Sequence, residues 1–271
     1  MDIRLIAVDL DGTALNSKKN LSPRTMSAIG RALRSGISVV PATGRSFSSI
    51  PRELLELRGI SYFILNNGSA VASMPGRNIL FSHVFRPEIT LSLLEQFKAY
   101  PCIILAARPG CGMMDQSIDR IKDERIEARF REIKKNWNPV VMDMEKEIRK
   151  DPSWVNFYTI VFTDEAEWQK NFSLLKKQEG LSISSSAWGC IDIMPPGIHK
   201  GKALCFITEK LGLEKSQVMA IGDNLNDFEM LQNAGYSVAM GNSVDALKEQ
   251  ADRITLSCDE DGAALAIEEI L

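Results

Sequence analysis

The chain has 271 residues, 45% of them hydrophobic, and its 32 basic and 35 acidic residues give a formal net charge of -3. This length favours two domains over one, and the lack of a strongly basic block in the sequence argues against a nucleic-acid partner. No apolar stretch approaches the roughly twenty residues that span a bilayer, so we expect no membrane partner. The five widely spaced cysteines indicate reduced thiols in a cytoplasmic protein.

The first predicted element is a short buried strand over residues 5–8, which runs directly into Asp9-Leu10-Asp11-Gly12-Thr13. An aspartate at the carboxyl end of a strand can act as a nucleophile. A second one, two residues later, points the same way and can handle the proton of a leaving group. Gly12 lets the backbone turn sharply beside them. The segment predicts a magnesium-dependent phosphoryl-transfer site, against the alternative of a turn with solvated acids.

A helix is predicted over residues 22–36, followed by a strand over 37–42 that ends at Thr43-Gly44-Arg45. A third strand, over 60–65, runs into Asn66-Asn67-Gly68. Strands and helices that alternate in this way predict a doubly wound parallel α/β sheet, whose ligands bind beyond the carboxyl ends of the strands. The Thr43 hydroxyl and nearby backbone N–H groups can hold phosphoryl oxygens. Arg45 could contact the substrate or bridge surface acids.

After a predicted hairpin over residues 70–85, the pattern changes, and residues 83–189 are predicted to form an inserted α+β domain. Residues 1–82 and 190–271 then form a discontinuous core. The run 119–135 mixes positive and negative charges, which favours a solvated helix face over a binding role. Four side chains could contact a substrate but are predicted to serve packing instead: Trp154, Tyr158, Trp188 and Cys190.

The parallel pattern resumes after a turn-rich passage over residues 193–201 that delivers Lys200 to the start of a helix. Its ammonium group could neutralise both a phosphate and the nucleophile, whereas His199 is a weak candidate for acid–base work. Asp223 and Asp227 follow a strand predicted over residues 218–221. Because Mg²⁺ prefers a few hard oxygen ligands, Asp9, Asp223 and one backbone carbonyl predict a partial magnesium shell, with Asp227 orienting ligands or waters.

In their order and spacing, these four segments resemble the haloacid dehalogenase-like hydrolase superfamily, and the insertion resembles the C2-type cap of the Cof-like sugar-phosphate phosphatases. The resemblance covers essentially the whole chain. It implies that Asp9 is the nucleophile, which forms an aspartyl-phosphate, and that Asp11 is the general acid and then the base. It also implies magnesium binding by Asp9, the Asp11 backbone carbonyl and Asp223, with support from Asp227. The implied phosphate contacts are the Leu10 backbone, Thr43, Gly44, Lys200 and Asn226.

The expected activity is magnesium-dependent hydrolysis of a small phosphorylated metabolite under a cap that excludes bulk water. By family resemblance, sugar phosphates are the first candidates for the substrate, and flavin mononucleotide and pyridoxal phosphate are other candidates. A sugar phosphomutase shares this core and cap, and a weakly catalytic sugar-phosphate binding protein is a third interpretation, against which the intact acidic set argues. A dinucleotide-binding enzyme is disfavoured because the first strand leads into paired aspartates instead of G-x-G-x-x-G.

Overall fold

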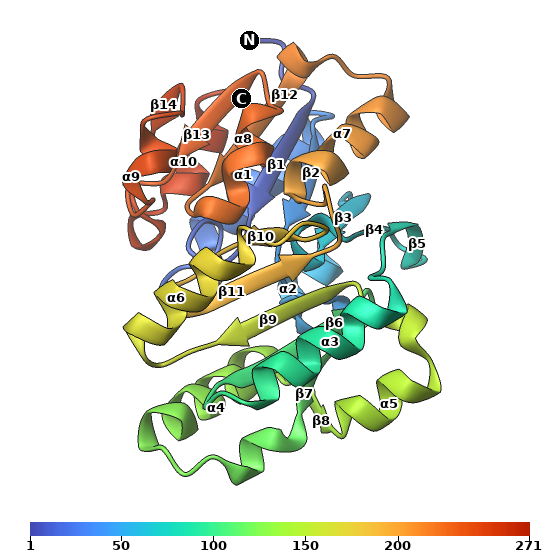
Figure 1. The fold of residues 1–271 in the computed structure, drawn as a ribbon. Helices are drawn as coiled ribbons and strands as arrows, with labels where there is room; N and C mark the ends of the chain where they lie inside the picture. The colour runs from blue at the N-terminus through green and yellow to red at the C-terminus, as the bar shows by residue number, and fades with distance from the viewer.

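The computed structural model describes residues 1–271, except for the side chain of Pro152, and contains two β-sheets, one above the other in Figure 1. The larger sheet has eight strands in the order β14-β13-β12-β1-β2-β3-β4-β5. These strands are β1 (Leu5–Asp9), β2 (Ser38–Ala42), β3 (Tyr62–Leu65), β4 (Ala70–Ser73), β5 (Asn78–Ser82), β12 (Val218–Gly222), β13 (Tyr236–Ala239) and β14 (Arg253–Ile254). The helices of this part of the chain are α1 (Pro23–Arg34), α2 (Arg52–Glu56), α7 (Lys200–Leu211), α8 (Phe228–Gln232), α9 (Asp245–Lys248) and α10 (Gly262–Glu268).

The strand β1 lies at the centre of the larger sheet, paired in parallel with β12 on one side and β2 on the other. Successive residues of a strand point to opposite faces, so β1 contributes to two cores. Ile6 and Val8 pack with the buried faces of α1 and α10, whereas Leu5 and Ala7 pack with α7 and α8. Six of the strands run parallel, and β4 and β5 are added antiparallel. A parallel sheet with helices on both faces confirms the predicted doubly wound core.

The smaller sheet has six strands in the order β10-β11-β9-β6-β7-β8, antiparallel except for the β7–β8 pair. Its strands are β6 (Ile103–Arg108), β7 (Cys111–Asp115), β8 (Val140–Met142), β9 (Phe157–Val161), β10 (Ser182–Ser184) and β11 (Cys190–Met194). Its helices are α3 (Pro87–Lys98), α4 (Glu124–Trp137), α5 (Met144–Lys150) and α6 (Glu165–Leu175). The helices α3 and α5 cover one face of this sheet, and α4 covers the other.

The helix α4 matters for the site because its carboxyl end reaches the larger sheet's domain. The side chain of Asp123 caps its first turn by accepting hydrogen bonds from the N–H groups of Arg125 and Ile126. Asn138 ends the helix in the left-handed conformation. Ile126 and Ile133 anchor its buried face against the smaller sheet, so the helix is held in a fixed orientation.

The strand β11 changes the expected division of the chain. Residues 190–194 lie in the segment predicted to belong to the core, yet β11 pairs with β9 and β10 of the smaller sheet. The passage over residues 193–201 is therefore turn-like only after Met194, where β11 ends. We propose that the inserted domain starts after β5 and extends through Met194.

Candidate active site

The two aspartates of the first motif lie where β1 ends, at the carboxyl edge of the larger sheet. Gly12, just after them, has φ +91, and a Cβ atom there would lie 2.5 Å from Oδ2 of Asp223. Only glycine allows both this backbone conformation and the close approach of the loop that follows β12. The loop after β1 therefore lies against the loop after β12, and Asp9, the last residue of β1, lies close to Asp223. Thr13 ties the two loops together by donating a hydrogen bond from Oγ1 to Oδ1 of Asp223 at 2.9 Å.

Lys200, the first residue of α7, points into this edge with no exposed surface. Its Nζ donates to Oδ1 of Asp9 at 2.5 Å and to Oδ1 of Asp227 at 2.7 Å. Burial acts to lower the pKa of Lys200, but the two carboxylates more than offset this and hold it above its ordinary value. The ammonium group therefore stays charged beside Asp9. His199 caps α7 by accepting from the N–H of Lys202, which gives it a structural task.

Three carboxylates gather around this single ammonium group. One oxygen from each of Asp9, Asp223 and Asp227 lies within 4.8 Å of the others. Burial, and then the charge of Asp227, raise the pKa of Asp9 to about 7. Burial and the charge of Asp9 raise the pKa of Asp223 well above its ordinary value. A buried cluster with more carboxylates than cations fits a divalent cation with hard oxygen ligands.

Within the cluster, Asp227 is occupied by other partners. Its Oδ1 accepts from Lys200, and its Oδ2 accepts from the backbone N–H groups of Asp223 at 2.9 Å and Asn224 at 3.2 Å. These bonds fix the loop that carries Asp223. Asp227 therefore orients its neighbours, while Asp9 and Asp223 are the carboxylates better placed to hold a metal ion.

Thr43, Gly44 and Arg45 follow β2 and line the same cavity as Asp9. Oγ1 of Thr43 accepts a hydrogen bond from the backbone N–H of Arg45 at 3.1 Å, which leaves its own proton free to donate. Arg45 itself is 4% exposed and pairs with both carboxylate oxygens of Asp11. It is thus neither a surface bridge nor free to reach a substrate in this conformation.

A chain of buried hydrogen bonds links the predicted phosphate contact Asn226 to the smaller sheet. Nδ2 of Asn226 donates to Oδ1 of Asn67 at 3.0 Å, and Nδ2 of Asn67 donates to Oδ2 of Asp192 at 3.1 Å. The other oxygen of Asp192 accepts from Oγ1 of Thr159 at 2.8 Å. Burial raises the pKa of Asp192, although the hydrogen bonds from Thr159 and Asn67 act against this. With both carboxyl oxygens accepting, Asp192 fixes the direction of both amides and leaves one N–H of Asn226 available.

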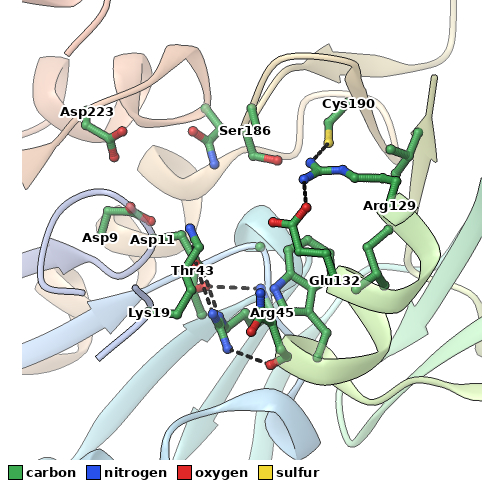
Figure 2. Close-up of a pocket in the computed structure, with 17 residues that line it drawn as sticks. Asp9, Asp11, Lys19, Thr43, Arg45, Arg129, Glu132, Ser186, Cys190 and Asp223 are labelled. Atoms are coloured by element: carbon green, nitrogen blue, oxygen red, sulfur yellow. Dashed lines mark hydrogen bonds and ion pairs between the residues drawn. The ribbon is translucent and has the colours of Figure 1, made fainter. Parts of the chain in front are cut away.

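The cavity has a volume of about 160 Å³ and lies between the two sheets' domains (Figure 2). It brings together Asp9, Asp11, Thr43, Gly44, Asp223 and Asn226 from the predicted site. Leu10 is fully buried and does not line it among the residues the structure describes. Lys200 contacts the cavity wall indirectly, by donating a hydrogen bond to Asp9, which lines the cavity.

The far wall of the cavity contradicts the expectation for residues 119–135. The helix α4 contributes Arg129, Glu132, Ile133, Asn136 and Trp137 to the lining, so this charged stretch is not merely a solvated face. The positions 129, 132, 133 and 136 share one side of a helix, a spacing that could have revealed them.

Of the four side chains weighed from the sequence as possible substrate contacts, Cys190 lines the cavity. Tyr158 is fully buried, and its hydroxyl donates to the backbone oxygen of Thr90. Trp188 is 57% exposed. The packing role predicted for Tyr158 fits this burial, whereas Cys190 both packs and faces the cavity.

Residues 6–267 match the family described as haloacid dehalogenase-like hydrolase. The chain belongs to this family. It is an enzyme of the haloacid dehalogenase-like type, as its four motif segments indicated. Among the described residues, no helix is long and apolar enough to cross a membrane.

Relatives and solved structures of this family match along nearly the whole chain. The 5-amino-6-(5-phospho-D-ribitylamino)uracil phosphatase YcsE of Bacillus subtilis is 32% identical over 98% of this chain and 95% of its own length. Phosphatase YwpJ of the same organism is 30% identical over 99% of this chain and all of its own length. A haloacid dehalogenase-like hydrolase from Bacteroides thetaiotaomicron has a TM-score of 0.81 at 29% identity, covering 99% of this chain and 100% of that one.

Proposed function

We propose that this haloacid dehalogenase-like hydrolase is a magnesium-dependent phosphatase for small metabolites that carry their phosphate on a sugar or sugar alcohol. The observation that carries this proposal is the contact of Asp9 with Lys200 at the edge of the cavity. A carboxylate held next to a buried, permanently charged ammonium group is suited to attack phosphorus, because the ammonium group offsets the repulsion between the two anions. The relatives named as phosphatases support the same reaction class.

In the first step, an oxygen of Asp9 forms a bond to phosphorus while the bond from phosphorus to the ester oxygen breaks. Asp11, once it has left Arg45 and taken up a proton, supplies the proton that the departing alkoxide needs. The products are an aspartyl-phosphate at Asp9 and a free alcohol. The Thr43 hydroxyl, the remaining N–H of Asn226 and the Lys200 ammonium group surround the phosphate and stabilise its charge.

In the second step, Asp11 takes a proton from water, whose oxygen then bonds to phosphorus as the bond to Asp9 breaks. Inorganic phosphate leaves, and both carboxyl groups return to their starting states. When bound, Mg²⁺ would supply charge neutralisation on the phosphate. Asp9, Asp223 and the backbone carbonyl of Asp11 would hold it, in keeping with the hard oxygen donors of the cluster.

The cap's position supports a small substrate. Arg45 donates to the backbone oxygen of Asn136 at 3.4 Å, and Oγ of Ser49 donates to that of Trp137 at 2.8 Å. These bonds join the carboxyl end of α4 to the segment that follows β2, so α4 lies over the cavity that contains Asp9. A folded protein surface is too bulky to approach Asp9 through such a cavity.

The test measures phosphate release from ribose 5-phosphate, a hexose phosphate, flavin mononucleotide, pyridoxal phosphate and an aryl phosphate, with magnesium or with chelator. The variant Asp9→Asn is assayed alongside wild type, and Asp119→Asn, an exposed position on the insertion, serves as its matched control. We expect release that requires magnesium and is retained in Asp119→Asn. The proposal fails if the folded, magnesium-loaded protein releases no phosphate from any compound, and formation of a phosphate isomer would indicate a mutase instead.

A further inference from the structure

The loop that follows the first motif holds Lys19 in a conformation that is uncommon for lysine. Lys19 has φ +64, in the left-handed region that glycine and asparagine favour. The loop is built around Asn16, whose Oδ1 accepts hydrogen bonds from the N–H groups of Lys18 at 3.1 Å and Asn20 at 3.0 Å. The backbone N–H of Lys19 donates to the backbone oxygen of Asn16 at 2.8 Å. These bonds fix the direction in which the Lys19 side chain leaves the backbone.

The side chain of Lys19 lines the cavity and contacts Asp11 there. Its Nζ lies 3.2 Å from Oδ1 of Asp11. Arg45 already donates to both oxygens of this carboxylate, each at 2.7 Å. One guanidinium group in this paired geometry neutralises one carboxylate, so two cations and one carboxylate leave a positive charge in excess. Lys19 is therefore not needed to neutralise Asp11.

Two other cations line the same cavity among the residues that the structure describes, and both are held more firmly. The Arg45 side chain is 4% exposed and makes two short bonds to its carboxylate partner. Arg129 donates to Oε2 of Glu132 at 2.5 Å, on the wall across the cavity from Asp9 (Figure 2). The Lys19 side chain is 33% exposed, and its ion pair is longer, at 3.2 Å. Lys19 is thus the lining cation that can change its partner with the least loss of contacts.

The charge of a bound phosphate favours such a change of partner. A phosphate ester carries nearly two negative charges at neutral pH, and Lys200 is already divided between Asp9 and Asp227. The cavity has a volume of only about 160 Å³ and is lined by both Asp9 and Lys19, so a phosphate beside one lies close to the other. Hydrogen bonds between two charged groups are strong, and an ammonium group on a flexible stem can turn toward a new partner. Lys19 gains more from a phosphate oxygen than from a carboxylate oxygen that Arg45 has neutralised.

We propose that Lys19 is a substrate-binding residue, which leaves Asp11 when a phosphate ester enters and donates to an oxygen of its phosphate. The oxygen is one that stays on phosphorus during the reaction, so the contact serves the ester and inorganic phosphate alike. The inference rests on the proposed phosphatase function for the position of the phosphate. It adds a phosphate contact from the loop after β1 to those expected from the sequence.

The test compares wild type with three variants of this loop. Lys19→Asn removes the charge but keeps a residue type that adopts the left-handed conformation. Lys19→Arg keeps the charge. Lys18→Asn is the matched control, because it removes the same charge at an exposed neighbouring position that does not line the cavity. Calorimetry on the magnesium-loaded proteins gives the dissociation constant of inorganic phosphate, and a kinetic assay with ribose 5-phosphate gives kcat and KM.

We expect Lys19→Asn to raise the dissociation constant of inorganic phosphate by about 10- to 100-fold, the effect of one hydrogen bond between charged groups. Lys19→Arg and Lys18→Asn should bind phosphate nearly as wild type does. The KM for ribose 5-phosphate should rise in Lys19→Asn by a similar factor.

Three results would overturn the inference. An equal loss of phosphate binding in Lys18→Asn and Lys19→Asn would show a general effect of charge. A lower kcat in Lys19→Asn with unchanged phosphate binding would mean that Lys19 only positions Asp11, and it would leave the phosphatase intact. Failure of wild type to bind phosphate would overturn both proposals. Phosphate binding that depends on Lys19, without turnover of any ester, would support the inference and refute the phosphatase.

Discussion

Arg45 holds both carboxylate oxygens of Asp11, with Nε and Nη2 each 2.7 Å from an oxygen. Burial acts to raise the pKa of Asp11, but this pairing and the charge of Lys19, 3.2 Å away, outweigh it and hold the pKa below its ordinary value. Asp11 is therefore ionised here. To donate a proton it must leave Arg45, so the pairing links the proposed general acid to Asn136 of α4, whose backbone oxygen Arg45 also contacts.

Arg45→Lys should raise the pKa of Asp11, because lysine keeps the charge but cannot make two parallel bonds to the carboxylate. The protonated form of Asp11 would then persist to higher pH. We expect the alkaline limb of the kcat/KM profile for a sugar phosphate to move upward. An aryl phosphate, whose leaving group needs less protonation, is the control substrate. An alkaline limb that stays in place for the sugar phosphate would show that Arg45 does not set this pKa.

Lys200→Met should destabilise the protein by about 3–5 kcal/mol, because it leaves buried carboxylates without their cation. Lys200 contacts both Asp9 and Asp227, so the double variant Lys200→Met/Asp227→Asn should lose less than the sum of the two single variants. Denaturant unfolding of all three variants at neutral pH without magnesium gives the coupling free energy between Lys200 and Asp227. Additive losses would mean that the ammonium group and Asp227 do not interact as the structure shows.

The stability of the metal-free protein should fall as pH rises from about 4 to about 7. Asp9 has a pKa of about 7 against an ordinary value of 3.8, and the pKa of Asp223 is also raised. A carboxyl group with a raised pKa in the folded state contributes stability that is present below its ordinary value and lost as pH rises through the folded value. Thermal unfolding in chelator, from pH 4 to 8, checks this expectation.

Magnesium should then stabilise the protein more at pH 8 than at pH 5, since the carboxyl groups must ionise to bind it. At a hundred times its dissociation constant, a bound ion adds about 2.7 kcal/mol. Asp9→Asn is the control, because it removes one ligand and one raised pKa together. Equal stabilisation by magnesium at both pH values would argue against a metal site at Asp9 and Asp223.

Asp192→Asn should weaken phosphate binding although Asp192 lies outside the cavity wall. An amide at position 192 can donate as well as accept, so Asn67 and Asn226 lose their fixed direction. We expect the inhibition constant for inorganic phosphate to rise about tenfold, the loss of about one hydrogen bond. Thr159→Val removes the other hydrogen bond to Asp192 and is the matched control. A rise of the same size in both variants would point to a general structural effect.

The edge of the larger sheet that carries Asp9, Thr43 and Asp223 could be predicted from the sequence, because its placement depends on local rules. Asp9, Thr43 and Asp223 each follow an apolar strand, and parallel strands bring their carboxyl ends to one edge. The strand β11 was missed because Pro195, Pro196 and Gly197 made its surroundings look like a turn. Its antiparallel partners are set by tertiary packing, which local propensity does not encode.

The place of Arg129 and Glu132 in the cavity wall and the Asn67–Asp192 bond could not be predicted for a different reason. Both depend on how the smaller sheet lies against the larger one. Asn67 and Asp192 are 125 positions apart in the chain, and neither residue type signals a partner. The helical spacing of Arg129 and Glu132 was visible, but whether that face meets solvent or a cavity depends on where α4 is anchored.

The most direct test of the central claim is to stop the reaction with acid during turnover of a sugar phosphate and to map the phosphorylated residue by mass spectrometry. We predict phosphate on the peptide that contains Asp9, in wild type with magnesium, and none there in Asp9→Asn, which should also lose turnover at least about a thousandfold. Asp9→Asn that keeps near-wild-type phosphate release, or turnover in wild type without phosphate on Asp9, would contradict the account.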